Sequence, residues 1–163
     1  MTAKTRIIPA LLLSAMLLPL SVCAIKEGDY YYIVSGGKAT ITYFKHSYSG
    51  ALSITNSLGG CPVTTIGNRA FRNRTSLTSV TIPDSVTSIG DDAFSGCTLL
   101  TSLTIPDSVT SIGEKAFASC DSIVSVTIPD SVTIIGADAF AGCDSLKSFT
   151  IGNGINTIER AVF

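Results

Sequence analysis

Three cysteines that recur at a fixed spacing are the first residues whose chemistry needs an explanation. Cys97, Cys120 and Cys143 follow one another at the same interval along the chain. Such thiols could form a disulfide, hold a metal ion or pack as small buried groups. Parallel side chains are poorly oriented for a disulfide, three thiols leave one unpaired, and no CxxC pair or histidine cluster accompanies them. The spacing therefore predicts buried thiols, and the unfolded, unreduced mature chain should show four free thiols.

Acidic residues form a second column with the same spacing, because Asp84, Asp107 and Asp130 each follow a proline. Stacked carboxylates could bind a cation, but hard cations usually take several ligands from one loop rather than one per repeat. Aspartates also suit turns, where they accept backbone N–H groups. We expect exposed turn residues, with a calcium site as the alternative, and calcium titration with a melting curve distinguishes the two.

A third column alternates in charge along the chain. Its members are Arg69, Asp92, Lys115 and Asp138. Stacked at this spacing, each charge would meet opposite neighbours, which predicts surface ion pairs worth about 0–1 kcal/mol each that fix the stacking register. Binding of a partner is the alternative role for this column.

The inventory of reactive groups argues against an enzyme. His46 is the only histidine, and it lies in a polar loop. No GxSxG motif, phosphate-binding loop or paired-carboxylate pocket is present in the sequence. A repeat also spreads identical residues along a surface, whereas an active site brings unlike groups together. We therefore expect a non-catalytic protein without a cofactor or metal, in which His46 is solvated.

These columns arise from four copies of one 23-residue unit, each opened by Ala-Phe, at 70–92, 93–115, 116–138 and 139–161. In the second copy Leu100, Leu103 and Ile105 give the spacing LxxLxL, and alternation with Ser or Thr predicts a strand with one buried face. A proline ends each strand in the first three copies. A second short extended piece follows, then a glycine expected to allow a sharp bend, then small residues that predict a short helical turn. Close similarity at this period indicates a solenoid.

The pattern AFxxCxxLxxVTIPDSVTxIG closely resembles the BspA-like leucine-rich repeats of secreted and surface proteins, over residues 63–163. The resemblance implies a right-handed leucine-rich repeat coil with a parallel β-sheet and little helix. It also implies a role in adhesion and in binding host or matrix proteins. No binding residue is carried over, because the family has no defined site to match.

Residues 1–24 look like a secretory signal. Lys4 and Arg6 are followed by an apolar run over 7–20 and then by small residues that suit cleavage after Ala24. A membrane anchor, for which the run is short, and a lipoprotein modified at Cys23 are the alternatives. Cleavage leaves nine basic and twelve acidic side chains, a net charge of −3, which disfavours nucleic acid. We expect a secreted or cell-surface protein with no membrane span after cleavage.

The segment 25–69 is predicted to be an N-terminal β cap with a partial first coil. Alternating aromatic and β-branched residues around Gly36-Gly37 predict a β-hairpin. The rest of the segment is predicted to contain a strand over 51–55 and a looser loop over 56–62, and to enter the repeat pattern from Val63. At the other end Val162-Phe163 matches the start of a fifth unit without a cap, which suggests a fragment or self-association through this end.

The outward positions of the predicted strands form a ladder of hydroxyl groups, our candidate partner-binding face. Its members are Ser79, Thr81, Ser102, Thr104, Ser125, Thr127, Ser148 and Thr150. The ladder lacks the Tyr, Trp and Arg that dominate tight interfaces, so a plain solvated face is an alternative, as is an ice-binding array. The leading hypothesis is an adhesion-type module that binds protein or glycan. The alternative is a structural spacer array, or a fragment of a larger surface protein whose function lies C-terminal.

Overall fold

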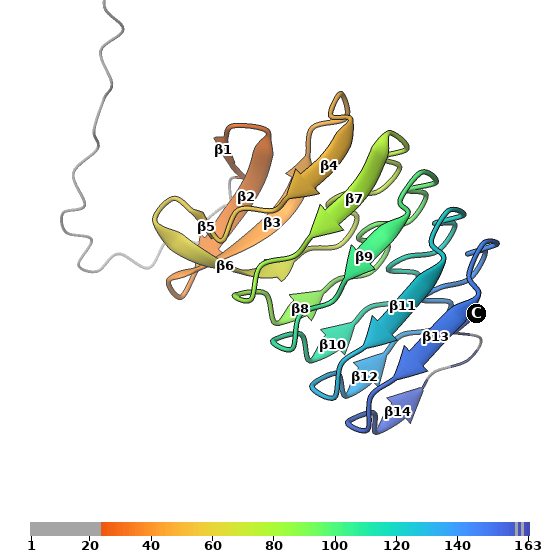
Figure 1. The fold of residues 1–163 in the computed structure, drawn as a ribbon. Coiled ribbons are helices and arrows are strands. Elements are labelled where there is room, and N and C mark those ends of the chain that lie inside the picture. The colour runs from red at the N-terminus through yellow and green to blue at the C-terminus, as the bar shows by residue number, and fades with distance from the viewer. Residues whose placement is uncertain (1–23, 159, 161) are drawn as a thin grey trace, which may run out of the picture.

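The chain coils into a stack of flat turns in the computed structural model, which describes residues 24–158, 160, 162 and 163 (Figure 1). The first part contributes β1 (Ile25–Glu27), β2 (Tyr30–Ser35), β3 (Lys38–Phe44), β4 (Gly50–Ser53), β5 (Ser57–Leu58) and β6 (Cys61–Ile66). The repeats contribute β7 (Leu77–Thr81), β8 (Ser88–Ile89), β9 (Ser102–Thr104), β10 (Ser111–Ile112), β11 (Ser125–Ile128), β12 (Ile134–Ile135), β13 (Ser148–Ile151) and β14 (Thr157–Ile158). The predicted signal peptide falls almost entirely outside the described residues.

The strands of the repeats form two rows along the stack (Figure 1). One row, β6-β8-β10-β12-β14, is parallel and continues through β3, β2 and β1 in the largest sheet. The other row consists of two separate sheets, β4-β7-β9 and β11-β13. Ser111 pairs with both Ser88 and Ile134, and Ile105 and Ile128 are buried. The predicted parallel-sheet solenoid, with equivalent positions of successive copies in register, is therefore confirmed.

A column of phenylalanine rings runs through the core. Adjacent rings of Phe71, Phe94, Phe117 and Phe140 lie 4.9, 5.4 and 5.2 Å apart between centroids and are nearly parallel. Phe44, at the end of β3, begins the column 5.1 Å from Phe71. Because Phe44 also donates its N–H to Ala70, as Phe71 does to Ala93, the N-terminal segment shares the core of the repeats.

The short helical turns expected after each Ala-Phe are series of hydrogen-bonded turns instead, and the described residues contain no helix. The N–H of Ser95 bonds to the carbonyl of Asp92 and that of Cys97 to Phe94, three positions back in each case. In the same turns, the N–H of Phe94 donates to the carbonyl of Ala116 in the next coil at 2.7 Å. Because alternate N–H groups bond between coils, the i to i−4 pattern of an α-helix cannot form.

The glycines expected to allow a sharp bend are required for a different reason. Gly90, Gly113 and Gly136 are not among the residues with positive φ. A Cβ on Gly113 would lie 2.6 Å from the backbone nitrogen of Asp91, so glycine is needed because neighbouring coils approach closely. Left-handed backbone occurs instead in the charged column, Arg69, Asp92, Lys115 and Asp138, with φ of 62°, 54°, 54° and 56°, and in the column of Asn73, Gly96, Ser119 and Gly142.

The N-terminal segment contains the predicted hairpin, in which β2 and β3 pair antiparallel around Gly36 and Gly37. Two features were not predicted: β1 adds an antiparallel strand to β2, and the loop expected over 56–62 contains the hairpin β5–β6. β3 then pairs parallel with β6, which bonds the hairpin to the first coil. The boundary of a cap at residue 69 stays a prediction.

A buried arginine joins this segment to the repeats. Arg74 is 3% exposed, its Nε donates to the carbonyl of Phe44 at 2.8 Å, and its Nη1 donates to the carbonyl of Arg72. The guanidinium also lies 4.7 Å from the Tyr43 ring centre, and Nη1 is 2.9 Å from His46 Nδ1. Burial lowers the pKa of Arg74. His46 is exposed, as expected of a solvated side chain, yet it also bonds to Arg74.

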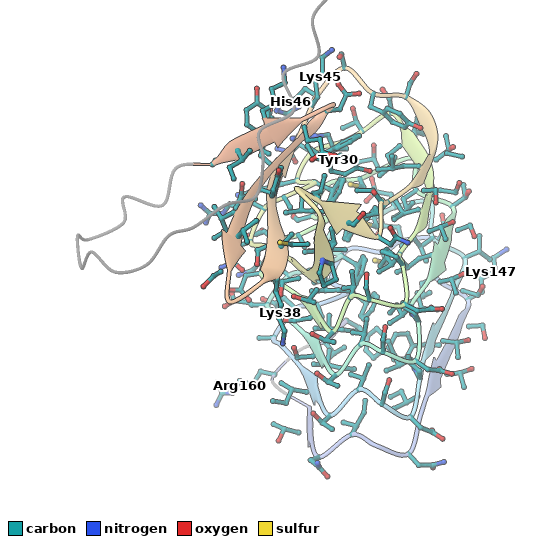
Figure 2. All side chains as sticks on the ribbon, turned by 90° about the vertical axis from the view of Figure 1, so that its left-hand side faces the viewer. Tyr30, Lys38, Lys45, His46, Lys147 and Arg160 are labelled. Carbon is teal, nitrogen blue, oxygen red and sulfur yellow. The ribbon has the colours of Figure 1, made fainter. Side chains whose placement is uncertain are left out.

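Basic side chains are spread over the outside of the stack. Figure 2 shows Lys38, Lys147 and Arg160 on its periphery, with Lys147 on the opposite side of that view from the other two. All three are exposed. No helix in the described part of the chain is long and apolar enough to cross a membrane.

Candidate binding faces

The structure aligns the predicted hydroxyl ladder along β7, β9, β11 and β13. Ser79 is partly buried, and the other seven members are exposed: Thr81, Ser102, Thr104, Ser125, Thr127, Ser148 and Thr150. Thr81 pairs with Thr104 and Thr127 with Thr150, so the hydroxyls stand in rows. We call these eight residues the hydroxyl face. Its role in binding stays a prediction.

The hydroxyl face is interrupted between β9 and β11, which belong to separate sheets. A cleft of about 300 Å³ lies there, and we call it the seam. The seam is lined by Leu103, Thr104, Ile105, Asp107, Ser125, Thr127 and Pro129. Near-identical copies predict an unbroken ladder, so sequence reasoning gave no signal for this break.

Two exposed apolar residues precede the strands of the seam. Leu99 is 53% exposed and Val124 is 45% exposed. The other copies carry serine in the Leu99 column, and threonine or lysine in the Val124 column. Apolar side chains therefore replace polar ones just before β9 and β11, where the sheet divides.

The second row of strands borders a larger hollow of about 470 Å³, which we call the glycine groove. Its floor holds the close-approach glycines Gly90, Gly113 and Gly136. Ser88, Ser111 and Ile134 line one side, and Asn68, Asp91 and Glu114 the other. Since a Cβ on these glycines would come within 3.0 Å of a neighbouring coil, side chains there cannot fill the groove.

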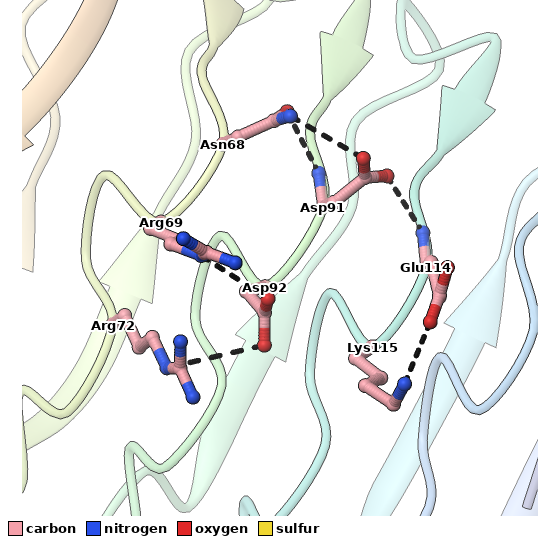
Figure 3. A network of polar contacts seen from close by, with 7 residues as sticks. All are labelled: Asn68, Arg69, Arg72, Asp91, Asp92, Glu114 and Lys115. Carbon is pink, nitrogen blue, oxygen red and sulfur yellow. Dashed lines mark hydrogen bonds and ion pairs between the residues drawn. The ribbon is translucent and has the colours of Figure 1, made fainter.

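Polar side chains along the glycine groove also hold adjacent coils together (Figure 3). The N–H of Asp91 donates to Asn68 Oδ1 at 3.0 Å, and the N–H of Glu114 donates to Asp91 Oδ1 at 2.9 Å. Ser111 Oγ lies 3.0 Å from Ser88 Oγ. Two coils thus each contribute a hydroxyl and a carboxylate to the groove, Ser88 with Asp91 and Ser111 with Glu114, a pattern that sequence reasoning missed.

The charged column forms some of the predicted surface ion pairs. Arg69 contacts Asp92 at 3.4 Å, and Lys115 contacts Asp138 at 3.7 Å. Arg72 adds an unpredicted contact to Asp92 at 3.9 Å. Lys115 also bonds Glu114 at 2.6 Å, which raises the pKa of Lys115. Exposed pairs of this kind contribute little to stability.

The cysteine column confirms the prediction of free, largely buried thiols. Cys61, Cys97, Cys120 and Cys143 are all free. Each repeat thiol contacts a phenylalanine carbonyl of the preceding coil at 3.2–3.3 Å: Cys97 with Phe71, Cys120 with Phe94, and Cys143 with Phe117. Burial raises the pKa of Cys97 to about 11 and also raises the pKa of Cys120. The protonated thiols therefore act as structural donors, and Arg74 supplies the donor in the first copy.

The aspartate column lies exposed at the corner between the two rows. Asp130 Oδ1 accepts the N–H of Asn153 at 2.7 Å, a bond to the next coil rather than within its own turn, so the expected turn role of these carboxylates stays a prediction. Within the described part of the chain, no three His, Cys, Asp or Glu side chains gather as potential metal ligands. At the last coil Ile151 and Phe163 are exposed, and self-association there stays a prediction.

A parallel-sheet solenoid whose strands carry LxxLxL spacing at a short period is a leucine-rich repeat protein. Residues 44–163 match the BspA type leucine rich repeat region in six copies, and the chain belongs to that family. The match begins before Ala70, so the family pattern reaches into the N-terminal segment.

Solved structures of similar proteins share this fold. A leucine-rich repeat protein from Bacteroides capillosus is 33% identical with a TM-score of 0.69, over 78% of this chain and 97% of that one. A leucine rich cell surface protein from Faecalibacterium prausnitzii is 32% identical with a TM-score of 0.66, over 86% of this chain and 45% of that one. The T. pallidum leucine rich repeat protein is 28% identical with a TM-score of 0.61, over 78% of this chain and 71% of that one. No curated protein matches the sequence.

Proposed function

We propose that this protein is a secreted or cell-surface module of the adhesion type, which binds a partner protein through the hydroxyl face. The observation that carries the proposal is the seam, where a cleft of about 300 Å³ interrupts an otherwise regular face. Exposed Leu99 and Val124 do not line this cleft, but they lie just before the strands that flank it and add apolar surface that the hydroxyl rows lack. Protein interfaces commonly combine such a small apolar centre with a polar rim.

The family and one solved relative support the proposed location. That relative is described as a leucine rich cell surface protein, and residues 1–24 of this chain have the pattern of a secretory signal. Solenoids typically serve as extended binding surfaces, which supports a non-catalytic role.

Purified matrix proteins, such as fibronectin and collagen, provide a panel of probes for surface binding measurements. Leu99→Ser and Val124→Thr introduce residues that other copies carry in the same columns, so the fold should be retained. We expect the double variant to weaken binding about tenfold, because exposed apolar side chains that a partner covers contribute strongly. Thr104→Lys with Thr127→Lys, which places two charges at the seam, should abolish binding.

A matched control uses Thr87→Lys with Thr110→Lys, two exposed threonines outside the hydroxyl face. These lysines add the same charge, so binding should be retained. If seam lysines leave binding unchanged while far-UV circular dichroism shows folded protein, the hydroxyl face is not the binding face. Binding to none of the probes would favour the spacer array.

A further inference from the structure

The glycine groove is a permanent feature of the stack. Its floor is open because a Cβ on Gly90 or Gly136 would lie within 3.0 Å of backbone atoms in the preceding coil. The groove runs from Asn68 to Gly136, so it crosses several successive coils. A hollow of about 470 Å³ is within the usual range of ligand sites. It lies along the row of β8, β10 and β12, and shares no lining residue with the seam.

We propose that the glycine groove binds a linear β-1,4-linked glycan lying along the stack, with about one sugar per coil. Phenylalanine rings of adjacent coils lie 4.9–5.4 Å apart between centroids. The paired strands β8, β10 and β12 along the groove are expected about 4.7–4.9 Å apart. This step is close to the length that one sugar adds to an extended β-1,4-linked chain. Sugars on the two middle coils would therefore each meet a serine hydroxyl and a carboxylate, from Ser88 and Asp91 on one coil and Ser111 and Glu114 on the next.

The chemistry of the groove suits a ligand with many hydroxyl donors. Asp91 is exposed and has no ion-pair partner among the described residues. Its carboxylate has room for further donors beyond the N–H of Glu114 and the amide of Asn68. Ser88 and Ser111 offer hydroxyl oxygens opposite. Ile134, which is 47% exposed, offers an apolar surface for the C–H face of a sugar ring.

Other linear polymers fit the groove less well. An extended peptide advances about 3.3 Å per residue, so neither one nor two residues match the coil step. Nucleic acid requires cationic partners for its phosphates, whereas Asp91 and Glu114 present carboxylates here. The glycan can be neutral or carry amino groups, because a carboxylate accepts hydrogen bonds from hydroxyl and ammonium groups alike.

Titration calorimetry on the full chain tests the proposal with cellohexaose, chitohexaose and the glucosamine hexamer as probes, and maltohexaose as the α-linked control. Affinity should rise with oligomer length up to about four sugars, which is the reach of the groove. Maltohexaose should bind at least about tenfold more weakly, since its curved chain does not follow a straight groove. Stronger binding of the glucosamine hexamer than of cellohexaose would identify an amino sugar, and the reverse a neutral glycan.

Ser111→Ile provides the groove variant, because Ile134 occupies the same column in the next coil and shows that isoleucine is accommodated there. Removing the hydroxyl and narrowing the groove should weaken glycan binding about tenfold or more. Asp91→Asn keeps an acceptor for Glu114, as Asn68 does for Asp91, and should weaken the glucosamine hexamer most.

Thr104→Ile is the matched control, since it makes a similar change on the hydroxyl face and should leave glycan affinity unaltered. The proposal is wrong if no β-linked hexamer binds, if maltohexaose binds equally well, or if Ser111→Ile has no effect on a folded protein. Because the seam variants test protein binding on a different face, failure of either proposal can be distinguished from failure of the other.

Discussion

Replacing Gly113 by alanine should destabilise the protein strongly, although its backbone conformation is one that alanine adopts readily. Gly113 is not among the residues with positive φ, so the substitution brings no left-handed strain. By itself, the smaller conformational freedom of the unfolded chain would favour alanine by about 0.4–1 kcal/mol. The expected loss of stability therefore has to come from contact between coils.

The structure gives the size of that contact. The new Cβ would lie 2.5 Å from Asp91 Oδ1, 2.6 Å from Asp91 N and 2.7 Å from the carbonyl carbon of Gly90. Two of these atoms belong to backbone, so the coils must separate, at about 1–3 kcal/mol for overpacking. Separation also stretches the bonds from Gly113 N–H to Ile89 and from Glu114 N–H to Asp91, worth about 1 kcal/mol each. We expect a net loss of about 2–4 kcal/mol.

Equilibrium urea unfolding followed by far-UV circular dichroism measures this loss, with the slope checked for a change in cooperativity. Gly37→Ala serves as a reference, because Gly37 has a φ of 72° and nothing within 4 Å of an added Cβ. That variant isolates left-handed strain, at about 1–2 kcal/mol. A loss below about 1 kcal/mol for Gly113→Ala would show that the coils yield easily, and that close approach does not explain the glycine column.

Three further predictions concern the core, a left-handed position and a buried thiol. Phe94→Ala removes a fully buried ring from the middle of the stack and should cost about 3–5 kcal/mol in urea unfolding; a cost below about 2 kcal/mol would contradict the packing. Ser119 has a φ of 55°, and two other copies carry Gly96 and Gly142 at this position. Ser119→Gly should raise the melting temperature, because it removes about 1 kcal/mol of left-handed strain. A lower melting temperature would refute this. Because folding raises the pKa of Cys97 from 9.0 to about 11, stability should be intact below pH 9 and fall by about 2–3 kcal/mol by pH 11. Cys97→Ala should flatten this part of the pH profile, and an unchanged profile would contradict the assignment.

The repeat itself could be predicted from the sequence because stacking depends on few physical requirements. A constant repeat period with LxxLxL spacing is enough to place Ile105 and Ile128 in one buried column, and the structure has them there. The hairpin around Gly36 and Gly37 was equally accessible, since its strands alternate and its turn residues are specific.

What the sequence could not predict depends on contacts between coils. The column of Gly113 looked like a bend, because a one-dimensional pattern does not contain the distance to the neighbouring backbone. The turns after Ala-Phe looked helical because short apolar segments do not reveal that their N–H groups bond to another coil. The seam is a break in the sheet that near-identical units do not predict. The glycine groove depends on how closely neighbouring coils approach, so Ser111 and Asp91 gave no advance signal.

Arg74 has a consequence for how such a repetitive chain finds its alignment. Near-identical coils offer the hairpin several equivalent docking places, each displaced by one unit. Only the first copy carries a guanidinium in the column where the later ones carry a thiol, and it alone bonds Phe44 and His46 while contacting Tyr43. If the hairpin docked on a later coil, Phe44, Tyr43 and His46 would lack the Arg74 guanidinium as their partner. A single residue therefore distinguishes the correct alignment from alignments shifted by one or more repeats.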